Sequence, residues 1–138
     1  MPQYHLHLFF RLGKNMKNSF IPTAYLRLDC PFSFKFLLFI TEARILDKIK
    51  LVQCHLDDDN YKKINAMLEE KTGTKASFPT VEIEEGCYQA ESDDLITYFA
   101  QKNNISVGQL PTLTAYKVGL LPRIISINQE NEALKAMN

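Results

Sequence analysis

The sequence has no long apolar run and no concentration of basic residues. Its longest uninterrupted apolar stretch, residues 36–40, is far shorter than the about 20 residues that a membrane-spanning helix needs. Sixteen basic residues balance sixteen acidic ones, and they form no cationic stripe of the kind that binds a phosphate backbone. We therefore expect neither a membrane nor a nucleic acid among the partners of this chain.

Cysteine is also scarce. The three cysteines, Cys30, Cys54 and Cys87, are odd in number and far apart in the chain, which argues against a disulfide framework and for a reducing compartment. The apolar residues 4–10 follow no basic region, so they do not match a secretory signal. The expected location is the cytoplasm.

With 138 residues, of which 46% are apolar and 23% are charged, the chain has the size and composition of one globular domain. The patterns described below divide it into an N-terminal extension at 1–22, a domain at 23–102 and a helical extension at 103–138. The N-terminal extension is expected to be disordered or to add a strand. No function is assigned to residues 1–15, because Met16 is a second candidate start.

Apolar periodicity predicts alternating strands and helices. The predicted strands are 24–28, 50–56, 80–84 and 87–89, and the predicted helices are 33–47, 60–71 and one that begins at residues 92–94. Pro31 suits the first turn of the first helix, and Gly73 suits the end of the second. A βαβ unit followed by a β-hairpin predicts an α/β fold, a thioredoxin-like four-stranded mixed sheet (β-α-β-α-β-β-α) flanked by helices.

The C-terminal residues carry an apolar stripe at helical spacing. The stripe consists of Leu113, Tyr116, Leu120, Leu121, Ile124 and Ile127. Pro111 suits the first turn of this helix, Gly119 and Pro122 are expected to kink it, and the polar residues from Asn128 onward are expected to fray. The stripe either packs on the domain or forms an interface with a second copy, which makes a homodimer through this helix a candidate assembly.

Several other residues are assigned structural roles. Cys54 and Cys87 lie in predicted strands and are expected to be inert core residues. The aromatic side chains at the start of the first helix are expected in the core rather than on a ligand platform: Phe32, Phe34 and Phe36. His5 and His7 have no third ligand in view, so no metal site is expected.

Cys30 stands at the junction between the first strand and the first helix, where residues 30–33 read Cys-Pro-Phe-Ser. Unpaired backbone N–H groups and the helix dipole at such a position favour the reactive thiolate over the thiol. A second cysteine in this segment would resolve a mixed disulfide, but Ser33 takes its place, so an external thiol such as glutathione would have to do so. The functional interpretation is a monothiol nucleophile, and the structural one is a buried cysteine that happens to precede a helix.

Two further segments have the composition of a binding site. Phe78-Pro79 precedes a strand and in this fold would lie beside Cys30; a cis peptide there would let the backbone of Phe78 pair with an extended peptide, whereas a trans proline would merely start the strand. Glu91-Ser92 opens the third helix, whose N–H groups and serine hydroxyl suit a carboxylate, while Glu91 suits an ammonium group. The structural alternative is plain N-capping by Ser92.

Three motifs follow one another in the chain: Cys-Pro-Phe-Ser after a strand, Phe-Pro before a strand, and Glu-Ser-Asp-Asp-Leu-Ile at a helix start. In this order they resemble the glutaredoxins and stand-alone proteins of the glutathione S-transferase N-terminal domain, over about residues 23–102. The resemblance implies glutathione as co-substrate and no metal. It makes Cys30 the catalytic thiol. The glutathione-binding residues that it implies are Arg27, Phe32, Ser33, Phe78, Pro79, Glu91 and Ser92.

Within that set, the resemblance pairs the Phe78 backbone with the cysteinyl unit of glutathione beside Pro79. Glu91 and Ser92 hold the γ-glutamyl end, and Arg27 meets the glycyl carboxylate or steadies the thiolate. Two departures matter. Because Ser33 replaces a second cysteine, dithiol reduction of protein disulfides is not expected. The C-terminal extension of 103–138 is far smaller than the helical domain of a glutathione S-transferase, so conventional conjugation is not expected either. The open hypotheses are a glutathione-dependent thiol transferase acting on mixed disulfides or electrophiles, a non-catalytic glutathione-binding or interaction module, and a purely structural use of the fold.

Overall fold

The computed structural model describes residues 19–137, and its centre is a four-stranded sheet in the order β2-β1-β3-β4. Strand β1 (Thr23–Arg27) pairs in parallel with β2 (Lys50–Cys54) and antiparallel with β3 (Thr80–Glu84). Strand β4 (Cys87–Ala90) closes the sheet through a hairpin with β3. The mixed sheet predicted from the strand and helix order is confirmed.

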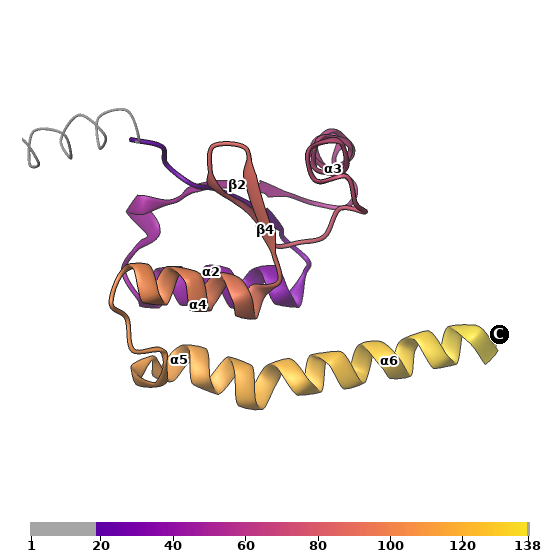
Figure 1. The fold of residues 1–138 in the computed structure, drawn as a ribbon. Coiled ribbons are helices and arrows are strands. Elements are labelled where there is room, and N and C mark those ends of the chain that lie inside the picture. The colour runs from indigo at the N-terminus through magenta and orange to yellow at the C-terminus, as the bar shows by residue number, and fades with distance from the viewer. Residues whose placement is uncertain (1–18, 138) are drawn as a thin grey trace, which may run out of the picture.

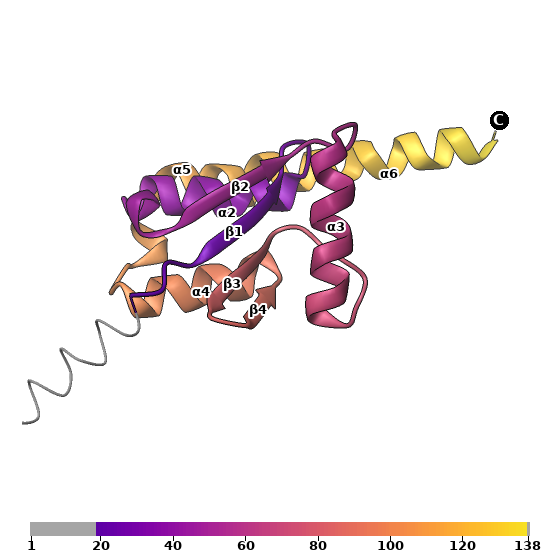
Figure 2. The same cartoon turned by 90° about the horizontal axis from the view of Figure 1, so that it is seen from above.

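Helices cover both faces of this sheet. Helix α2 (Pro31–Glu42) follows β1, and helix α4 (Ser92–Lys102) follows β4; the two lie side by side on one face. Helix α3 (Asp59–Thr72) lies on the opposite face (Figures 1 and 2). The fold is therefore the α/β, thioredoxin-like arrangement expected from the sequence. None of the helices formed by the described residues is both long enough and apolar enough to cross a membrane.

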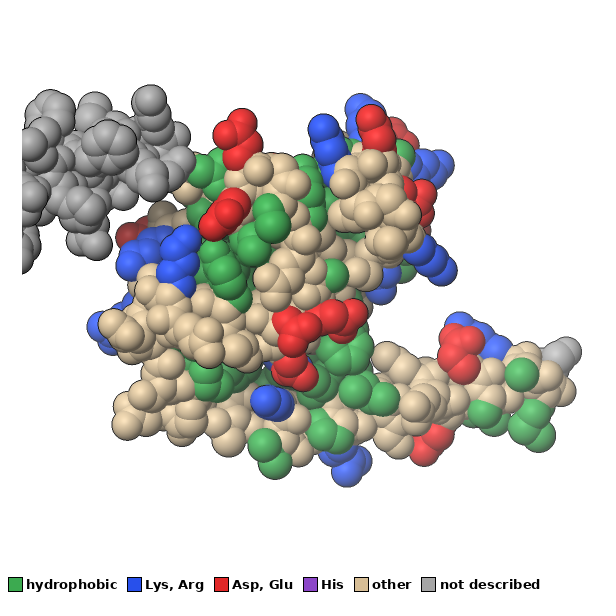
Figure 3. Space-filling model, in the orientation of Figure 1, with side chains coloured by type: hydrophobic (Ala, Val, Ile, Leu, Met, Phe, Trp, Pro, Cys, Tyr) green, Lys and Arg blue, Asp and Glu red, His purple; other side chains and the backbone are tan. Residues whose placement is uncertain are grey.

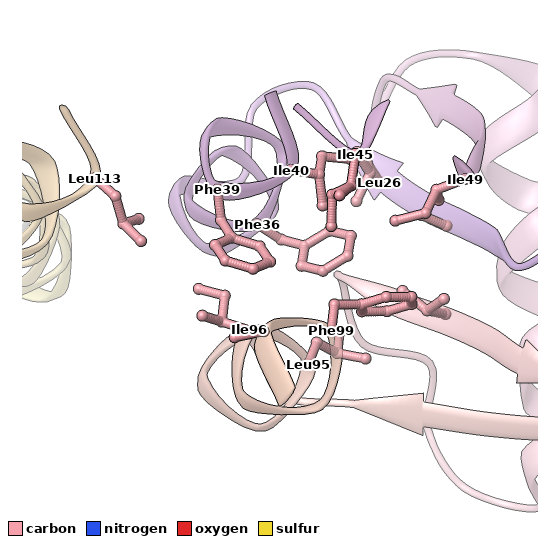
Figure 4. Close-up of a cluster of buried hydrophobic side chains, with 13 residues drawn as sticks. Leu26, Phe36, Phe39, Ile40, Ile45, Ile49, Leu95, Ile96, Phe99 and Leu113 are labelled. Carbon is pink, nitrogen blue, oxygen red and sulfur yellow. The ribbon is translucent and has the colours of Figure 1, made fainter. Parts of the chain in front are cut away.

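The hydrophobic core lies between the sheet and the pair α2–α4. The side chains of Phe36 and Phe39 are fully buried on the inner face of α2, and the ring centroid of Phe36 is 5.7 Å from that of Phe99 on α4. Figure 4 shows these rings enclosed between the two helices, with Leu113 of the C-terminal extension approaching α2 from outside. Spacings of three and four along α2 thus put one continuous apolar face against the sheet and α4.

Helix α2 ends earlier than its apolar periodicity predicts. The predicted helix 33–47 stops at Glu42, because Arg44 adopts a left-handed conformation (φ 61°) and turns the chain into a short 3₁₀ segment, η1 (Leu46–Lys48). The side chain of Ile45 is nevertheless buried in the core. The periodicity continues past the helix end because the turn, rather than a further helical turn, returns this side chain to the core.

Three residues that were expected in the core are exposed: Cys87, Phe32 and Phe34. Cys54 is buried as expected, but Cys87 is exposed, because it lies beside the hairpin turn on the edge strand β4. On α2, Phe36 is buried, whereas Phe32 and Phe34 are 40% and 49% exposed, since α2 buries only one face.

Helix α3 ends at Thr72 and is capped by Gly73 at φ 72°, as its glycine predicts.

The C-terminal extension is one continuous helical rod. A short 3₁₀ segment, η2 (Val107–Gln109), leads into α5 (Pro111–Thr114), the π-helical segment η3 (Ala115–Leu120) and α6 (Leu121–Met137). Gly119 lies in the π-helical segment, in which the regular hydrogen-bond ladder is shifted, and Pro122 is the second residue of α6. The kink expected at these two residues stays a prediction. The prediction that the chain frays from Asn128 is wrong, since α6 stays helical to Met137.

Glu42 fixes the start of this rod to the end of α2. The backbone N–H groups of Thr112 and Leu113 each donate to the Glu42 carboxylate at 2.8 Å. A carboxylate at this position satisfies N–H groups that have no partner inside the first helical turn. The side chains of Leu113, Tyr116 and Leu121 are buried on the same side of the rod, so the first half of the predicted stripe packs on the domain.

This contact predicts that docking of the extension weakens in acid. Partial desolvation of Glu42 opposes its ionisation, but the hydrogen bonds from Leu113 and Thr112 outweigh it and lower the pKa of the carboxyl. Because the folded-state pKa is lowered, the stabilisation is complete above the ordinary value of 4.5 and is lost as pH falls through the lower folded value. We expect hydrogen-exchange protection of the Leu113 amide, measured by NMR as a protection factor, to fall over that range in the wild type.

In Glu42→Gln, whose side chain does not ionise, the protection of this amide should be lower near neutral pH and should not change through the same window. Glu70→Gln, which removes an exposed carboxylate from α3, serves as the matched control and should behave like the wild type. The same pH dependence in Glu42→Gln as in the wild type would show that another group controls docking.

Candidate functional site

The ends of all four strands bring the predicted site residues to one edge of the sheet. Strands β1 and β2 end at this edge, and because β3 runs antiparallel to β1, it begins there. Thr80 of β3 pairs with Ala90 of β4. The segment Phe78-Pro79, just before Thr80, therefore lies beside Glu91-Ser92, just after Ala90, and both lie next to the end of β1, from which Cys30 follows.

Cys30 is the N-cap residue of α2, and its sulfur contacts two backbone groups. The Ser33 N–H donates to Sγ at 3.5 Å, and Sγ lies 3.5 Å from the carbonyl oxygen of Phe78, to which a thiol would donate. The sulfur thus accepts from one backbone group and lies within donating distance of another. The residue is buried, with 8% of its surface exposed.

Ser33 is buried, and its hydroxyl group forms a hydrogen bond with the backbone. Its hydroxyl oxygen accepts a hydrogen bond from the Arg27 N–H at 3.1 Å, which ties the first turn of α2 to the end of β1. The side chain is only 2% exposed. Its hydroxyl is therefore part of the support of Cys30, and its backbone N–H is the group that faces the sulfur.

The Phe78-Pro79 peptide is cis, as expected, and Pro79 is buried while Phe78 is half-buried. The Phe78 ring packs against Tyr61 of α3, with centroids 5.9 Å apart. The Thr80 hydroxyl donates to the Ser77 carbonyl at 2.7 Å and holds the start of β3. These contacts fix the backbone of Phe78 beside Cys30.

Ser92 does not cap α4. The N-cap position is held by Glu91, which has φ 72° and makes no side-chain capping bond, and Ser92 is the first helical residue, 6% exposed. Strand β4 runs directly into the helix, so the chain reverses within the one residue Glu91. The expectation of N-capping by Ser92 is therefore wrong, while the carboxylate of Glu91 is exposed beside the first N–H groups of α4.

The Arg27 guanidinium is directed towards Asp29 and Cys54. Its Nε lies 2.8 Å from Asp29 Oδ1, and its charge acts on Cys54, the residue opposite it on β2. Burial raises the pKa of the Cys54 thiol, and the nearby Arg27 counteracts this only in part. The two roles suggested for Arg27 by resemblance remain predictions.

An ion pair between a buried lysine and a largely exposed aspartate lies beside the site and was not anticipated from the sequence. Lys35 is 3% exposed, and its Nζ lies 2.6 Å from Asp93 Oδ1 at the start of α4 and 6.0 Å from the centroid of the Phe32 ring. Hydrogen bonding to Lys35 lowers the pKa of Asp93 against a smaller effect of burial, and Lys117 of η3, 3.9 Å away, acts in the same direction. The available signal was a lone lysine inside the apolar run of α2.

Tyr116 of the extension closes over the first turn of α2. Its hydroxyl donates to the Pro31 carbonyl at 2.6 Å, and its ring meets Phe34 edge-on, with centroids 5.1 Å apart. Burial raises the pKa of this phenol, and the nearby Cys30 adds to the effect. The C-terminal rod is thus part of the wall around the site.

Two apolar pockets adjoin the outer face of α2 and share Phe34 and Leu37. One, of about 240 Å³, lies between α2 and the ends of β1 and β2. The other, of about 420 Å³, lies between α2 and the start of α5. Ser33 lines the first of these pockets and not the second. No group of three or more potential metal ligands occurs among residues 19–137, and His5 and His7 lie outside the described residues.

No protein-family model and no curated protein matches the sequence. Solved structures similar to this chain include glutathione transferase Omega 2C from Trametes versicolor, with 17% identity over 67% of this chain and a TM-score of 0.44. Oxidized glutaredoxin 2 from Chlamydomonas reinhardtii has 19% identity over 75% of this chain and 87% of its own length, with a TM-score of 0.45.

A third similar structure is glutathione transferase Omega 2S from Trametes versicolor in complex with 2,4-dihydroxybenzophenone, with 16% identity over 67% of this chain and a TM-score of 0.40. The chain spans 39% of the length of each of the two transferases.

The Lys35–Asp93 pair predicts an asymmetric response to mutation. Asp93→Asn leaves a buried ammonium without its counter-charge and should destabilise the protein by about 1–3 kcal/mol, at the low end because Asp93 is largely exposed. Lys35→Met keeps the volume without the charge and should cost less. Urea unfolding followed by circular dichroism measures both.

Asp94→Asn is the matched control, since Asp94 is an exposed neighbour on the same first turn of α4. Combining Lys35→Met with Asp93→Asn should remove most of the loss caused by Asp93→Asn alone. Equal free energies of unfolding for the Asp93 and Asp94 variants would show that the Lys35–Asp93 ion pair does not stabilise the protein.

Proposed function

We propose that this protein is a glutathione-dependent monothiol transferase in which Cys30 is the nucleophile. The observation that carries the proposal is the position of its sulfur, which receives the Ser33 N–H at the start of α2 and lies 3.5 Å from the Phe78 carbonyl. A helix N-terminus favours the thiolate, and the backbone beside a cis proline suits an extended peptide.

The proposed reaction proceeds in two exchanges. The Cys30 thiolate attacks the glutathione sulfur of a mixed disulfide, a bond forms between Cys30 and that sulfur, and the substrate leaves as a thiolate that takes up a proton. A second glutathione thiolate then attacks the glutathione sulfur bound to Cys30, which releases oxidised glutathione and restores the Cys30 thiolate. Two molecules of glutathione are consumed as reductant in each cycle that starts from an ordinary disulfide, one to form the mixed disulfide and one to clear it.

Glutathione would bind along the sheet edge. The free N–H groups at the start of α4, with Ser92, suit the γ-glutamyl carboxylate, and the exposed carboxylate of Glu91 suits its ammonium group. The backbone of Phe78 would pair with the cysteinyl unit and bring its sulfur to Cys30. Phe32, exposed next to Lys35, would border the bound peptide.

The low exposure of Cys30 favours small substrates over folded proteins. With only 8% of Cys30 exposed, a slender disulfide would reach the sulfur more readily than a folded protein, and the pockets along α2 would take an apolar substituent. A cell compartment rich in reduced glutathione, such as the cytoplasm, would supply the co-substrate and keep the free cysteines reduced.

The same burial favours a second candidate, a glutathione-binding module without turnover. In that alternative the sulfur is too enclosed by the first turn of α2 and the Tyr116 contact to react, while the sheet edge still binds the tripeptide. The two candidates differ in turnover and agree in binding.

The deciding experiment measures reduction of the mixed disulfide of glutathione and 2-mercaptoethanol, together with glutathione binding by calorimetry. We expect Cys30→Ser to lower the rate by more than about 100-fold, to the uncatalysed level, because the nucleophile is lost. Cys87→Ser, which removes an exposed cysteine on β4, is the matched control and should keep the wild-type rate.

An inactive wild type that still binds glutathione would favour the binding module over the enzyme. Absence of glutathione binding by both the wild type and Cys30→Ser would reject both candidates. Equal rates for wild type and Cys30→Ser would remove Cys30 from the reaction.

A further inference from the structure

Helix α6 projects beyond the domain. Leu121 is its last buried residue, and every residue from 126 to 137 is exposed, so no described part of the domain covers this half of the helix (Figure 1). A segment of this length without tertiary packing is only marginally helical in water. The projecting part of α6 therefore needs a further contact to account for its regular structure.

One side of α6, together with Leu120 at the end of η3, carries a heptad pattern. The residues recur at alternating spacings of four and three, and we call this set the α6 seam: Leu120, Ile124, Ile127, Asn131 and Leu134. Leu120, Ile127 and Leu134 are 59%, 51% and 60% exposed. Alternating spacings of four and three are those of a two-helix coiled coil, in which a single polar residue such as Asn131 is tolerated.

The charges of α6 favour a partner that carries both positively and negatively charged side chains. Arg123 and Lys135 balance Glu130 and Glu132 along the helix, and Figure 3 shows hydrophobic side chains interleaved with both kinds of charge on its projecting part. A neutral helix lacks the net positive charge that anionic lipid or nucleic acid would attract. A second copy of the same helix offers a matching apolar seam and matching charges.

The charges also favour one orientation. Lys135 lies 3.9 Å from Glu132 of its own helix, whereas Arg123 and Glu130 make no ion pair with any residue in 19–137. Arg123 and Glu130 occupy the same flank of the seam, one heptad apart. In an antiparallel pair, residues on that flank face each other, so each Arg123 meets Glu130 of the second copy.

We propose that the protein forms a homodimer through an antiparallel pair of α6 helices. The twofold axis lies between Ile124 and Ile127, so that Ile124 of each copy packs against Ile127 of the other. The two Arg123–Glu130 contacts flank this seam. The projecting residues of α6 lie apart from the Cys30 site, which the rod contacts through Tyr116 of η3.

The first test is the oligomeric state of the full chain, measured by sedimentation velocity from micromolar to near-millimolar concentration. The wild type should show a concentration-dependent dimer. Ile127→Glu places a carboxylate against the apolar side chain of Ile124 of the other copy, on both sides of the axis, and should stay monomeric throughout. Gln129→Glu introduces the same charge on the opposite side of α6 and should dimerise like the wild type.

Circular dichroism and the mixed-disulfide assay check that both variants fold, since Ile127 is exposed and its replacement leaves the core intact. A wild type that is monomeric at every concentration overturns the proposal. Equal association of Ile127→Glu and Gln129→Glu overturns it as well.

A charge exchange tests the orientation. Arg123→Glu and Glu130→Arg should each weaken self-association about tenfold or more, because each places like charges together. Mixing the two variants should restore dimers, since one helix is then acidic and the other basic at both positions. A parallel pair would instead join Glu130 to Lys135, so an unaffected Arg123→Glu variant would reject the antiparallel dimer.

Discussion

The contact between the Cys30 sulfur and the Phe78 carbonyl joins two segments that lie 48 residues apart in the chain. It exists because β1 and β3 are antiparallel neighbours, so that the end of one strand meets the start of the other. The hairpin β3–β4 then brings the start of α4 to the same edge. Sheet topology alone therefore assembles a thiol, a peptide backbone and a helix N-terminus in one place, without a long loop.

Helix α2 is the element on which the site, the core and the extension all depend. Its first turn holds Cys30, its inner face supplies Phe36 to the core, and Lys35 reaches the start of α4. Its two ends also hold the C-terminal rod, through the Pro31 carbonyl and the Glu42 carboxylate. A shift of this helix would therefore change the geometry of the sulfur and the docking of the rod together.

Local patterns predicted the elements well, and tertiary contacts explain what they missed. The alternation in 80–84 and the glycine at the end of α3 each act within a few residues, so strand and helix could be inferred from them. The Lys35–Asp93 pair joins α2 to α4, and the left-handed Arg44 ends a helix whose apolar periodicity continues, so neither has a local signature. The exposure of Cys87 follows from its place on an edge strand, which the order of strands in the sheet decides.

Ser33 connects the proposed monothiol chemistry to the rigidity of the site. Its hydroxyl accepts from the Arg27 N–H and fixes the first turn of α2 to β1, while its own N–H donates to the Cys30 sulfur. A thiol in its place would accept this backbone hydrogen bond only weakly, because sulfur is a poor acceptor. The residue that removes internal resolution of a mixed disulfide is thus the one that holds the remaining sulfur in position. A single-thiol site built in this way depends on an external thiol for turnover and on a backbone bond for its geometry.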